Sequence, residues 1–263
     1  MNLLDKFNNI LPKNTKHQPF IIWTFRRVGG TNFANTLFEH CNATSFYLEP
    51  FNINRVFGSI HTQYRTQNNK EALRRSLFNA LEKKPVLKHC LEMSAPGFNE
   101  VLLEVTQQLG YKHLFLYREH AKSRLLSLNF SFKTNIWQPT HFKTRTFEDK
   151  IFSEYIDCKK LINHEYQCRK KMSHIYNLLD ASDNRYALSF ETLYKKSKNE
   201  SLKTIDSVYN FLNIGLALLT KKEVDQILQK GSLNSQNLYT RFPNSSEFIK
   251  QLETIPTFNL QNN

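Results

Sequence analysis

Residues 19–32, PFIIWTFRRVGGTN, decide the fold. Their first half is a short run of β-branched and aromatic residues, which is typical of a buried strand. Gly29 and Gly30 end this run, and apolar residues then recur at helical spacing, at Phe33, Leu37, Phe38 and Cys41. The stretch therefore predicts a strand, a glycine turn and a helix.

The same alternation continues along the chain. Strand patterns at 85–91, 113–117 and 186–190 alternate with helical patterns at 101–109, 118–132, 150–180 and 201–213. Because strands that alternate with helices form parallel sheets, the sequence predicts an α/β fold with a central, mostly parallel sheet. Residues 231–246 are rich in Asn and Ser, and we expect them to form a surface loop.

The composition limits the class of protein. The 263 residues include 36 Lys and Arg against 23 Asp and Glu, and this net charge of +13 indicates an anionic partner. No apolar run approaches the roughly 18 residues that a membrane helix needs, and the first residues do not resemble a signal peptide. The four cysteines lack metal-binding spacing, so we expect a cytoplasmic protein without a structural metal.

The glycine turn has the composition of an anion-binding site. Backbone N–H groups at the start of a helix point toward an anion, and the helix dipole favours negative charge there. Gly29 and Gly30 allow close approach of the backbone, and Thr31 is placed to cap the helix and to donate to a phosphate oxygen. The Walker A pattern GxxxxGK[ST] is absent, which disfavours an ordinary P-loop ATPase.

The turn resembles a loop of the sulfotransferases, which transfer a sulfuryl group from 3′-phosphoadenosine-5′-phosphosulfate (PAPS). Their loop has the form R-x-G-[ST]-T, and residues 27–31, RVGGT, match it with Gly in the fourth place. In the family, a second strand ends in an Arg that is followed by a Ser one helical stretch later, and this pair grips the 3′-phosphate. Residues 113–128, HLFLYREHAKSRLLSL, are similar, with Arg118 and Ser127 in these places and Ser123 as an alternative to Ser127.

Further matches follow in family order. Residues 186–193, YALSFETL, resemble the family's late strand ending in Y-E-x-L, with Phe in place of Tyr, and residues 203–214 resemble the next helix. The spacing R-E-x7-S is similar to that of the bacterial nodulation-type carbohydrate sulfotransferases. The resemblance implies a P-loop-like three-layer sandwich. It also implies a single sulfotransferase domain over 1–263, with a core at about 19–214 and a helical and loop extension at 215–263.

The resemblance also implies roles for individual residues. Arg27 is the first candidate to clamp the leaving phosphate, and Arg26 is the competing candidate. Because neighbouring strand residues point to opposite sides, we expect one of the two to be structural or exposed. The acceptor hydroxyl needs a base, for which Glu49 in YLEPFN and His89 in PVLKHCLEM are candidates, with Glu49 preferred. The residues expected to bind PAPS are Arg26, Arg27, Val28, Gly29, Gly30, Thr31, Asn32, Arg118, Ser127 and Arg241.

The expected reaction gives a sulfate ester on a saccharide or glycolipid hydroxyl, with 3′-phosphoadenosine-5′-phosphate (PAP) as the second product. No metal and no nucleic acid is expected to take part, and the acceptor site is expected at 50–80 and 130–170. One alternative is a nucleotide-dependent kinase with a degenerate phosphate loop, although such a loop would need a Lys. A second is a non-enzymatic basic nucleic-acid-binding protein, although the usual signatures are missing from the sequence. The sequence identifies neither the acceptor nor the oligomeric state.

Overall fold

The structure of the protein is a computed structural model. It describes residues 18–41, 44–46, 49–137, 149–180, 184–194, 197–214, 225 and 236–261.

The centre of the molecule is a five-stranded sheet with the order β2-β3-β1-β4-β5, in which every neighbouring pair is parallel. Ile22 at the middle of β1 is aligned with Lys88 on one side and Leu114 on the other. The predicted α/β class with a parallel sheet is therefore confirmed. The strands are β1 (Phe20–Thr24), β2 (Ser45–Phe46), β3 (Val86–Cys90), β4 (Lys112–Tyr117) and β5 (Arg185–Ser189).

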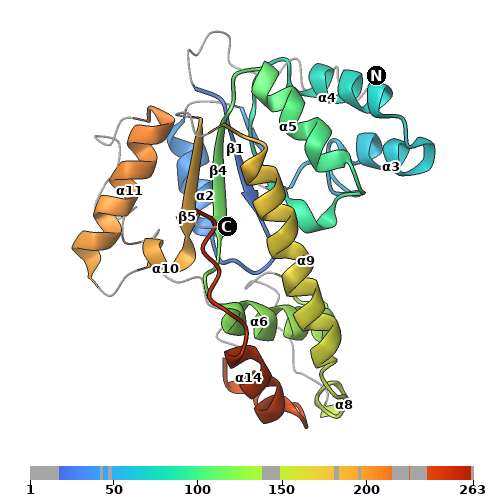
Figure 1. The fold of residues 1–263 in the computed structure, drawn as a ribbon, viewed down its shortest axis with the longest axis vertical. Coiled ribbons are helices and arrows are strands. Elements are labelled where there is room, and N and C mark those ends of the chain that lie inside the picture. The colour runs from blue at the N-terminus through green and yellow to red at the C-terminus, as the bar shows by residue number, and fades with distance from the viewer. Residues whose placement is uncertain are drawn as a thin grey trace.

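Helices cover both faces of the sheet. Figure 1 shows α2 (Thr31–His40) and α11 (Lys198–Leu212) on one side, and α5 (Phe98–Gln108) and α9 (Cys158–Asn177) on the other. This arrangement gives three layers, as parallel strands joined by helical crossovers require. The other helices are η1 (Leu91–Met93), α3 (Gly58–Gln67), α4 (Lys70–Leu81), α6 (Ala121–Thr134), α8 (Asp149–Phe152), α10 (Phe190–Leu193), α13 (Gln236–Tyr239) and α14 (Ser245–Glu253).

Central strands explain the apolar runs in the sequence. All residues of β1 and β3 are buried, because each of these strands is covered by helices on both faces. Lys88 and His89 are the exceptions to the apolar pattern of β3, and both are buried. Buried polar groups need partners, so these two residues indicate polar contacts near the end of β3.

A second apolar cluster lies beside the sheet, around α6. It includes Phe130, Phe152, Phe242 and Phe248, so the C-terminal segment packs against α6 and α8. The expected surface loop at 231–246 is therefore wrong at residues 236–239, which form α13, and at 245–246, where α14 begins, whereas residues 240–244 are a turn, as predicted. The apolar residues Tyr239 and Phe242 explain the difference, since both are buried.

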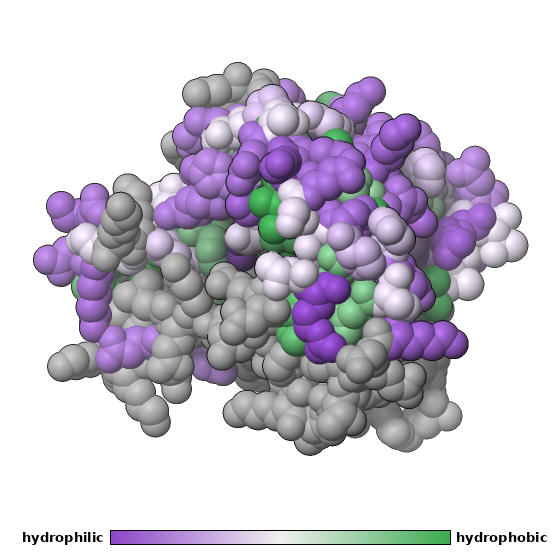
Figure 2. Space-filling model, turned by 90° about the horizontal axis from the view of Figure 1, so that it is seen from below, coloured by the Kyte–Doolittle hydropathy of each residue, from purple (hydrophilic) through white to green (hydrophobic). Residues whose placement is uncertain are grey.

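All five strands end at the same edge of the sheet, at the bottom of Figure 1 and close to α6. In open parallel sheets, ligands bind beside the carboxyl ends of the strands, where the strand order changes direction. Here β1 is flanked by β3 and β4, so the turn after β1 lies at such a point. Figure 2 views the molecule from this side, and hydrophilic residues dominate the described surface around small apolar patches.

Among the helices of the described residues, none combines the length and the apolar character needed to cross a membrane.

Candidate functional site

The turn between β1 and α2 is built on two residues in the left-handed region. Arg27 has a φ of 64° and Gly29 a φ of 89°. A Cβ atom at Gly29 would lie 2.8 Å from Cε2 of Phe190, which is below van der Waals contact. Residue 29 therefore has to be glycine, for both conformation and space.

Gly30 has a different reason to lack a side chain. A Cβ atom there would lie 1.9 Å from Cδ2 of Leu116 on the neighbouring strand β4. The Ser or Thr that the sulfotransferase loop has at this place does not fit against Leu116. The departure from the family pattern at Gly30 is therefore matched by a large residue on β4.

The start of α2 differs from the prediction in one detail. Gly30 is the N-cap residue, no side chain caps the helix, and Thr31 is its first residue. The expected capping role of Thr31 is therefore wrong. Thr31 and Asn32 still lie in the first turn of α2, where backbone N–H groups have no partner within the helix.

Arg27 turns toward α6. Its Nε donates to Oγ of Ser127 over 2.7 Å, and its Nη1 donates to the carbonyl oxygen of Trp137 over 2.9 Å. Burial lowers the pKa of Arg27, and the charge of Tyr239 opposes that shift in part. Of the two predicted serines, the structure brings Ser127 to the turn, whereas Ser123 is exposed on the same helix.

Arg118 reaches the turn from the end of β4. Its Nε donates to the carbonyl oxygen of Val28 over 2.9 Å, and its guanidinium lies 3.9 Å from the centre of the Phe190 ring. Burial lowers the pKa of Arg118, Glu191 opposes this, and the charges of Arg124 and Arg27 add to the lowering. Within the described part of the chain, no carboxylate forms an ion pair with Arg27 or Arg118.

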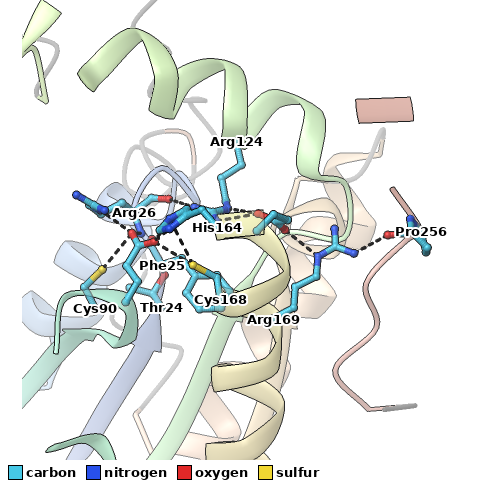
Figure 3. Close-up of polar contacts among 11 residues, drawn as sticks. Thr24, Phe25, Arg26, Cys90, Arg124, His164, Cys168, Arg169 and Pro256 are labelled. Atoms are coloured by element: carbon cyan, nitrogen blue, oxygen red, sulfur yellow. Dashed lines mark hydrogen bonds and ion pairs between the residues drawn. The ribbon is translucent and has the colours of Figure 1, made fainter. Parts of the chain in front are cut away.

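Arg26 points to a different set of partners (Figure 3). Its backbone N–H and its Nε both donate to Oε1 of Glu92, over 2.9 and 2.6 Å. Its guanidinium also lies 5.0 Å from the ring centre of Phe132 and 5.4 Å from that of Trp137. Arg26 and Arg27 both contact Trp137 but differ in their other partners. Strand alternation does not explain this difference, because β1 ends at Thr24 and both arginines lie in the turn after it.

Glu92 connects the turn to α9. Its Oε2 lies 2.6 Å from Nε2 of His164 and accepts from Sγ of Cys168 over 3.1 Å. Burial alone would raise the pKa of Glu92, but the hydrogen bond with His164 and the charges of Arg124 and Arg26 hold this pKa well below its usual range. Glu92 is therefore a charged carboxylate in the interior.

Arg124 on α6 extends this arrangement. Its side chain is 1% exposed, its Nη2 lies 2.7 Å from Oε2 of Glu165, and its Nη1 lies 3.9 Å from Oε2 of Glu92. Arg169 pairs with the other oxygen of Glu165 over 2.8 Å and donates to the carbonyl oxygen of Pro256. We call Arg26, Glu92, Arg124, Glu165 and Arg169 the ion-pair network. It was not predicted from the sequence.

The donor atoms of Glu92, His164 and Cys168 lie within 4.8 Å of one another, as ligands of a metal ion would. Two guanidinium groups already balance the charge of Glu92, because Arg26 binds its Oε1 and Arg124 lies near its Oε2. Burial, together with the charge of Glu92, raises the pKa of the Cys168 thiol far above its ordinary value, which opposes the thiolate form that binds metals. These three residues therefore fit a hydrogen-bonded cluster better than a metal site.

The two candidate bases differ in their surroundings. Glu49 is 23% exposed, and its Oε1 lies 3.1 Å from Nζ of Lys88. His89 is buried, and its Nε2 is bonded to Asn99 at 2.8 Å and to Ser94 at 3.1 Å. Burial lowers the pKa of His89 to about 4. Of the two, only Glu49 has access to solvent in this structure.

Arg241, which was predicted to bind PAPS, contacts the second apolar cluster. Its guanidinium is 3.8 Å from the centre of the Phe152 ring in the second apolar cluster. Nearby in the sequence, Oδ1 of Asn244 accepts from the backbone N–H of Ile156 over 2.8 Å. The contacts found for these two residues join the C-terminal segment to α8 and its neighbours.

Comparisons with known proteins give little further information. No family model matches the chain, and no curated protein matches its sequence. Among solved structures, it is similar to a chain from a study of the PezAT chromosomal toxin–antitoxin system of the human pathogen Streptococcus pneumoniae. The two are 10% identical with a TM-score of 0.36, over 95% of this chain and 94% of that one. A similarity this distant assigns neither a family nor a function.

Proposed function

We propose that this chain is a PAPS-dependent sulfotransferase that acts on a hydroxyl group of a saccharide or glycolipid. The observation that carries this proposal is the pair of guanidinium groups, Arg27 and Arg118, at a tight turn before a helix, where no carboxylate of the described residues pairs with them. Keeping an arginine buried without a directly paired carboxylate costs free energy, which a bound anion would offset, and the nearby charge of Glu191 opposes this cost only in part at Arg118. Two such groups on one turn fit a ligand with more than one anionic group, as PAPS has.

The residues divide the ligand between them. The turn and the first N–H groups of α2 would hold the 5′-phosphosulfate, and Arg118 with Ser127 would hold the 3′-phosphate. When bound, PAPS supplies the sulfuryl group. Arg27 stays charged at any working pH, so it would stabilise the negative charge of the leaving phosphate without donating a proton.

Glu49 is the proposed base. Its carboxylate is partly exposed and lies in the loop after β2, on the same edge of the sheet as the turn. It would accept the proton of the acceptor hydroxyl once the hydroxyl replaces Lys88 as its partner. His89 would need to leave both Asn99 and Ser94 to do the same, so we leave it out of the mechanism.

The kinase alternative would use the same turn for ATP. The turn carries Arg26 and Arg27 but no Lys, and the acid after β3, Glu92, already binds Arg26 and His164. An acid that is occupied in this way is poorly placed to hold a magnesium ion. These residues therefore favour the sulfotransferase over the kinase.

The test is a thermal-shift titration with PAP, ATP or duplex DNA at fixed ionic strength. PAP at about 100 times its Kd should stabilise the protein by ~2.7 kcal/mol, which raises the Tm of a chain of this size by about 5 °C. Arg118→Met should abolish this shift, because it removes one of the two guanidinium groups.

Arg185→Met is the matched control. Arg185 also lies over an aromatic ring, 4.1 Å from the centre of Tyr176, and donates to a carbonyl oxygen, that of Leu179. It lies at the start of β5, at the opposite edge of the sheet, so its variant should keep the PAP response. If PAP does not shift the Tm, the sulfotransferase proposal is wrong. A shift with ATP would then support the kinase, and a shift with DNA would support the nucleic-acid-binding protein.

A further inference from the structure

The backbone of Arg26 is held at both of its polar groups. The N–H of Arg26 donates to Oε1 of Glu92 over 2.9 Å, and the carbonyl oxygen of Arg26 accepts from Nη1 of Arg124 over 3.1 Å. Arg27 follows directly, with its φ of 64°. An L-residue enters this region only when its surroundings hold it there.

The side chains of Glu92 and Arg124 are themselves buried and paired. Glu92 and Arg124 are 2% and 1% exposed, and they lie 3.9 Å apart at Oε2 and Nη1. Glu165 on α9 binds Arg124 on its other side. Figure 3 shows that Arg26, His164 and Cys168 come from separate elements and lie close together. Each of the three contacts Glu92.

The Glu92 carboxylate also determines which of the two arginines is ion-paired. Oε1 of Glu92 accepts from Nε of Arg26 at 2.6 Å, so it holds both the backbone and the side chain of Arg26. Arg27 is left to bind Ser127, beside Arg118 at the turn. One carboxylate therefore separates a structural arginine from one that is available to a ligand.

We infer that Glu92 and Arg124 are positioning residues, which fix the backbone N–H and C=O of Arg26 so that the turn already has its anion-binding shape before any ligand arrives. Neither residue is assigned to contact the ligand. The inference deepens the proposed function and rests on it where PAP binding is concerned. Its conformational part concerns the free protein alone.

A pair of variants separates positioning from charge. Glu92→Gln and Glu92→Ala remove the same negative charge from beside the turn, and by charge alone each should bind PAP more tightly. Gln keeps a carbonyl oxygen for the N–H of Arg26, whereas Ala does not. Positioning predicts that Glu92→Gln binds PAP at least as tightly as the unmodified protein and that Glu92→Ala binds it about ten-fold more weakly, measured by titration calorimetry.

The control is Tyr111→Phe, which removes a buried hydrogen bond of 2.8 Å to the carbonyl oxygen of Pro85. Tyr111 directly precedes β4, at the opposite edge of the sheet from the turn. This variant loses stability without touching the turn, so its affinity for PAP should not change. Equal weakening in Tyr111→Phe and Glu92→Ala would reduce the effect of Glu92 to general stability and overturn the inference.

A measurement on the free, unmodified protein needs neither PAP nor a folded Glu92→Ala variant. Amide hydrogen exchange, followed residue by residue by NMR, should find the N–H of Arg26 protected, because Glu92 accepts it in a partly buried site. Exchange of this amide at the rate of an exposed loop would overturn the inference. Protection at Arg26 in a protein that fails to bind PAP would instead keep the positioning and remove the proposed function.

Discussion

Arg26 and Arg27 are neighbours in one turn, yet their surroundings are opposite in character. Arg26 belongs to the ion-pair network, in which Glu92 and Glu165 are shared among three arginines. Arg27 is bonded to a hydroxyl and a carbonyl oxygen, and Arg118 to a carbonyl oxygen, with no carboxylate paired to either among the described residues.

The difference indicates which buried arginines stabilise the fold and which are available to bind an anion. In the network, each buried guanidinium has an anionic partner from the chain, so removing one partner leaves a buried charge uncompensated. At the turn, dipoles only partly stabilise the guanidinium groups, and the lowered pKa of both reflects their burial. The network should therefore determine stability, and the turn should determine affinity for anions.

Breaking the network should have the largest effect. Glu165→Ala removes the carboxylate that binds both Arg124 and Arg169, and it should lower the free energy of unfolding by about 3–5 kcal/mol. Urea denaturation measures this loss. Glu253→Ala is the control, because its pair with Lys122 is exposed and should contribute at most about 1 kcal/mol. Equal losses in the two variants would contradict the role given to the network.

Lowering the pH should reduce the stability of the protein first through the buried histidines of the sheet, and not through either group of arginines. Burial lowers the pKa of His89 to about 4 and that of His113 to about 3, whereas both titrate near 6.5 when unfolded. Between pH 6.5 and 4 the unfolded chain binds more protons, so stability is complete above pH 6.5 and falls as the pH falls. From pH 7 to pH 5 the loss should be on the order of 3 kcal/mol.

Urea denaturation at the two pH values measures this loss. His89→Asn, which keeps a neutral polar group near Asn99 and Ser94, should reduce the pH dependence without reversing its sign. A protein equally stable at pH 5 and pH 7 would show that these histidines are not held neutral in the core.

A smaller effect is expected from placing in the turn a residue of the type that the sulfotransferase loop has there. Gly30→Ser places a Cβ atom 1.9 Å from Cδ2 of Leu116 and should lower the free energy of unfolding by about 1–3 kcal/mol. In the background of Leu116→Ala the same substitution should have little effect, because its obstacle is gone. Thermal unfolding of the four proteins measures the coupling. Additive effects of the two substitutions would show that Gly30 and Leu116 are not matched.

The sequence predicted those features that depend on neighbouring residues. The apolar run of β1, the glycine turn and the helical spacing of α2 are local signals, and the parallel sheet follows from their alternation with later segments. The resemblance to the sulfotransferases also pointed to Arg118 and Ser127, which the structure brings to the turn.

The ion-pair network was beyond such reasoning. Arg26 and Glu92 are separated by 66 positions, and Arg124 and Glu165 by 41, so no spacing rule connects them. Arg124 reads from the sequence as one more charge on a basic helix, and only its burial shows otherwise. For the same reason the sequence could not show whether Arg26 or Arg27 faces the ligand, because this depends on the ion pair between Arg26 and the distant Glu92.

The most direct test of this division is a crossed comparison of Arg26→Met and Arg27→Met, measuring the unfolding free energy and the affinity for PAP in both. Arg26→Met should lose more stability and bind PAP within a few-fold of the unmodified protein. Arg27→Met should stay within about 1 kcal/mol in stability and bind PAP about 100-fold more weakly, as loss of a charge-assisted contact to an anion would produce. The reverse pattern, or a loss of both properties in both variants, would contradict the assignment of Arg26 to structure and Arg27 to the ligand.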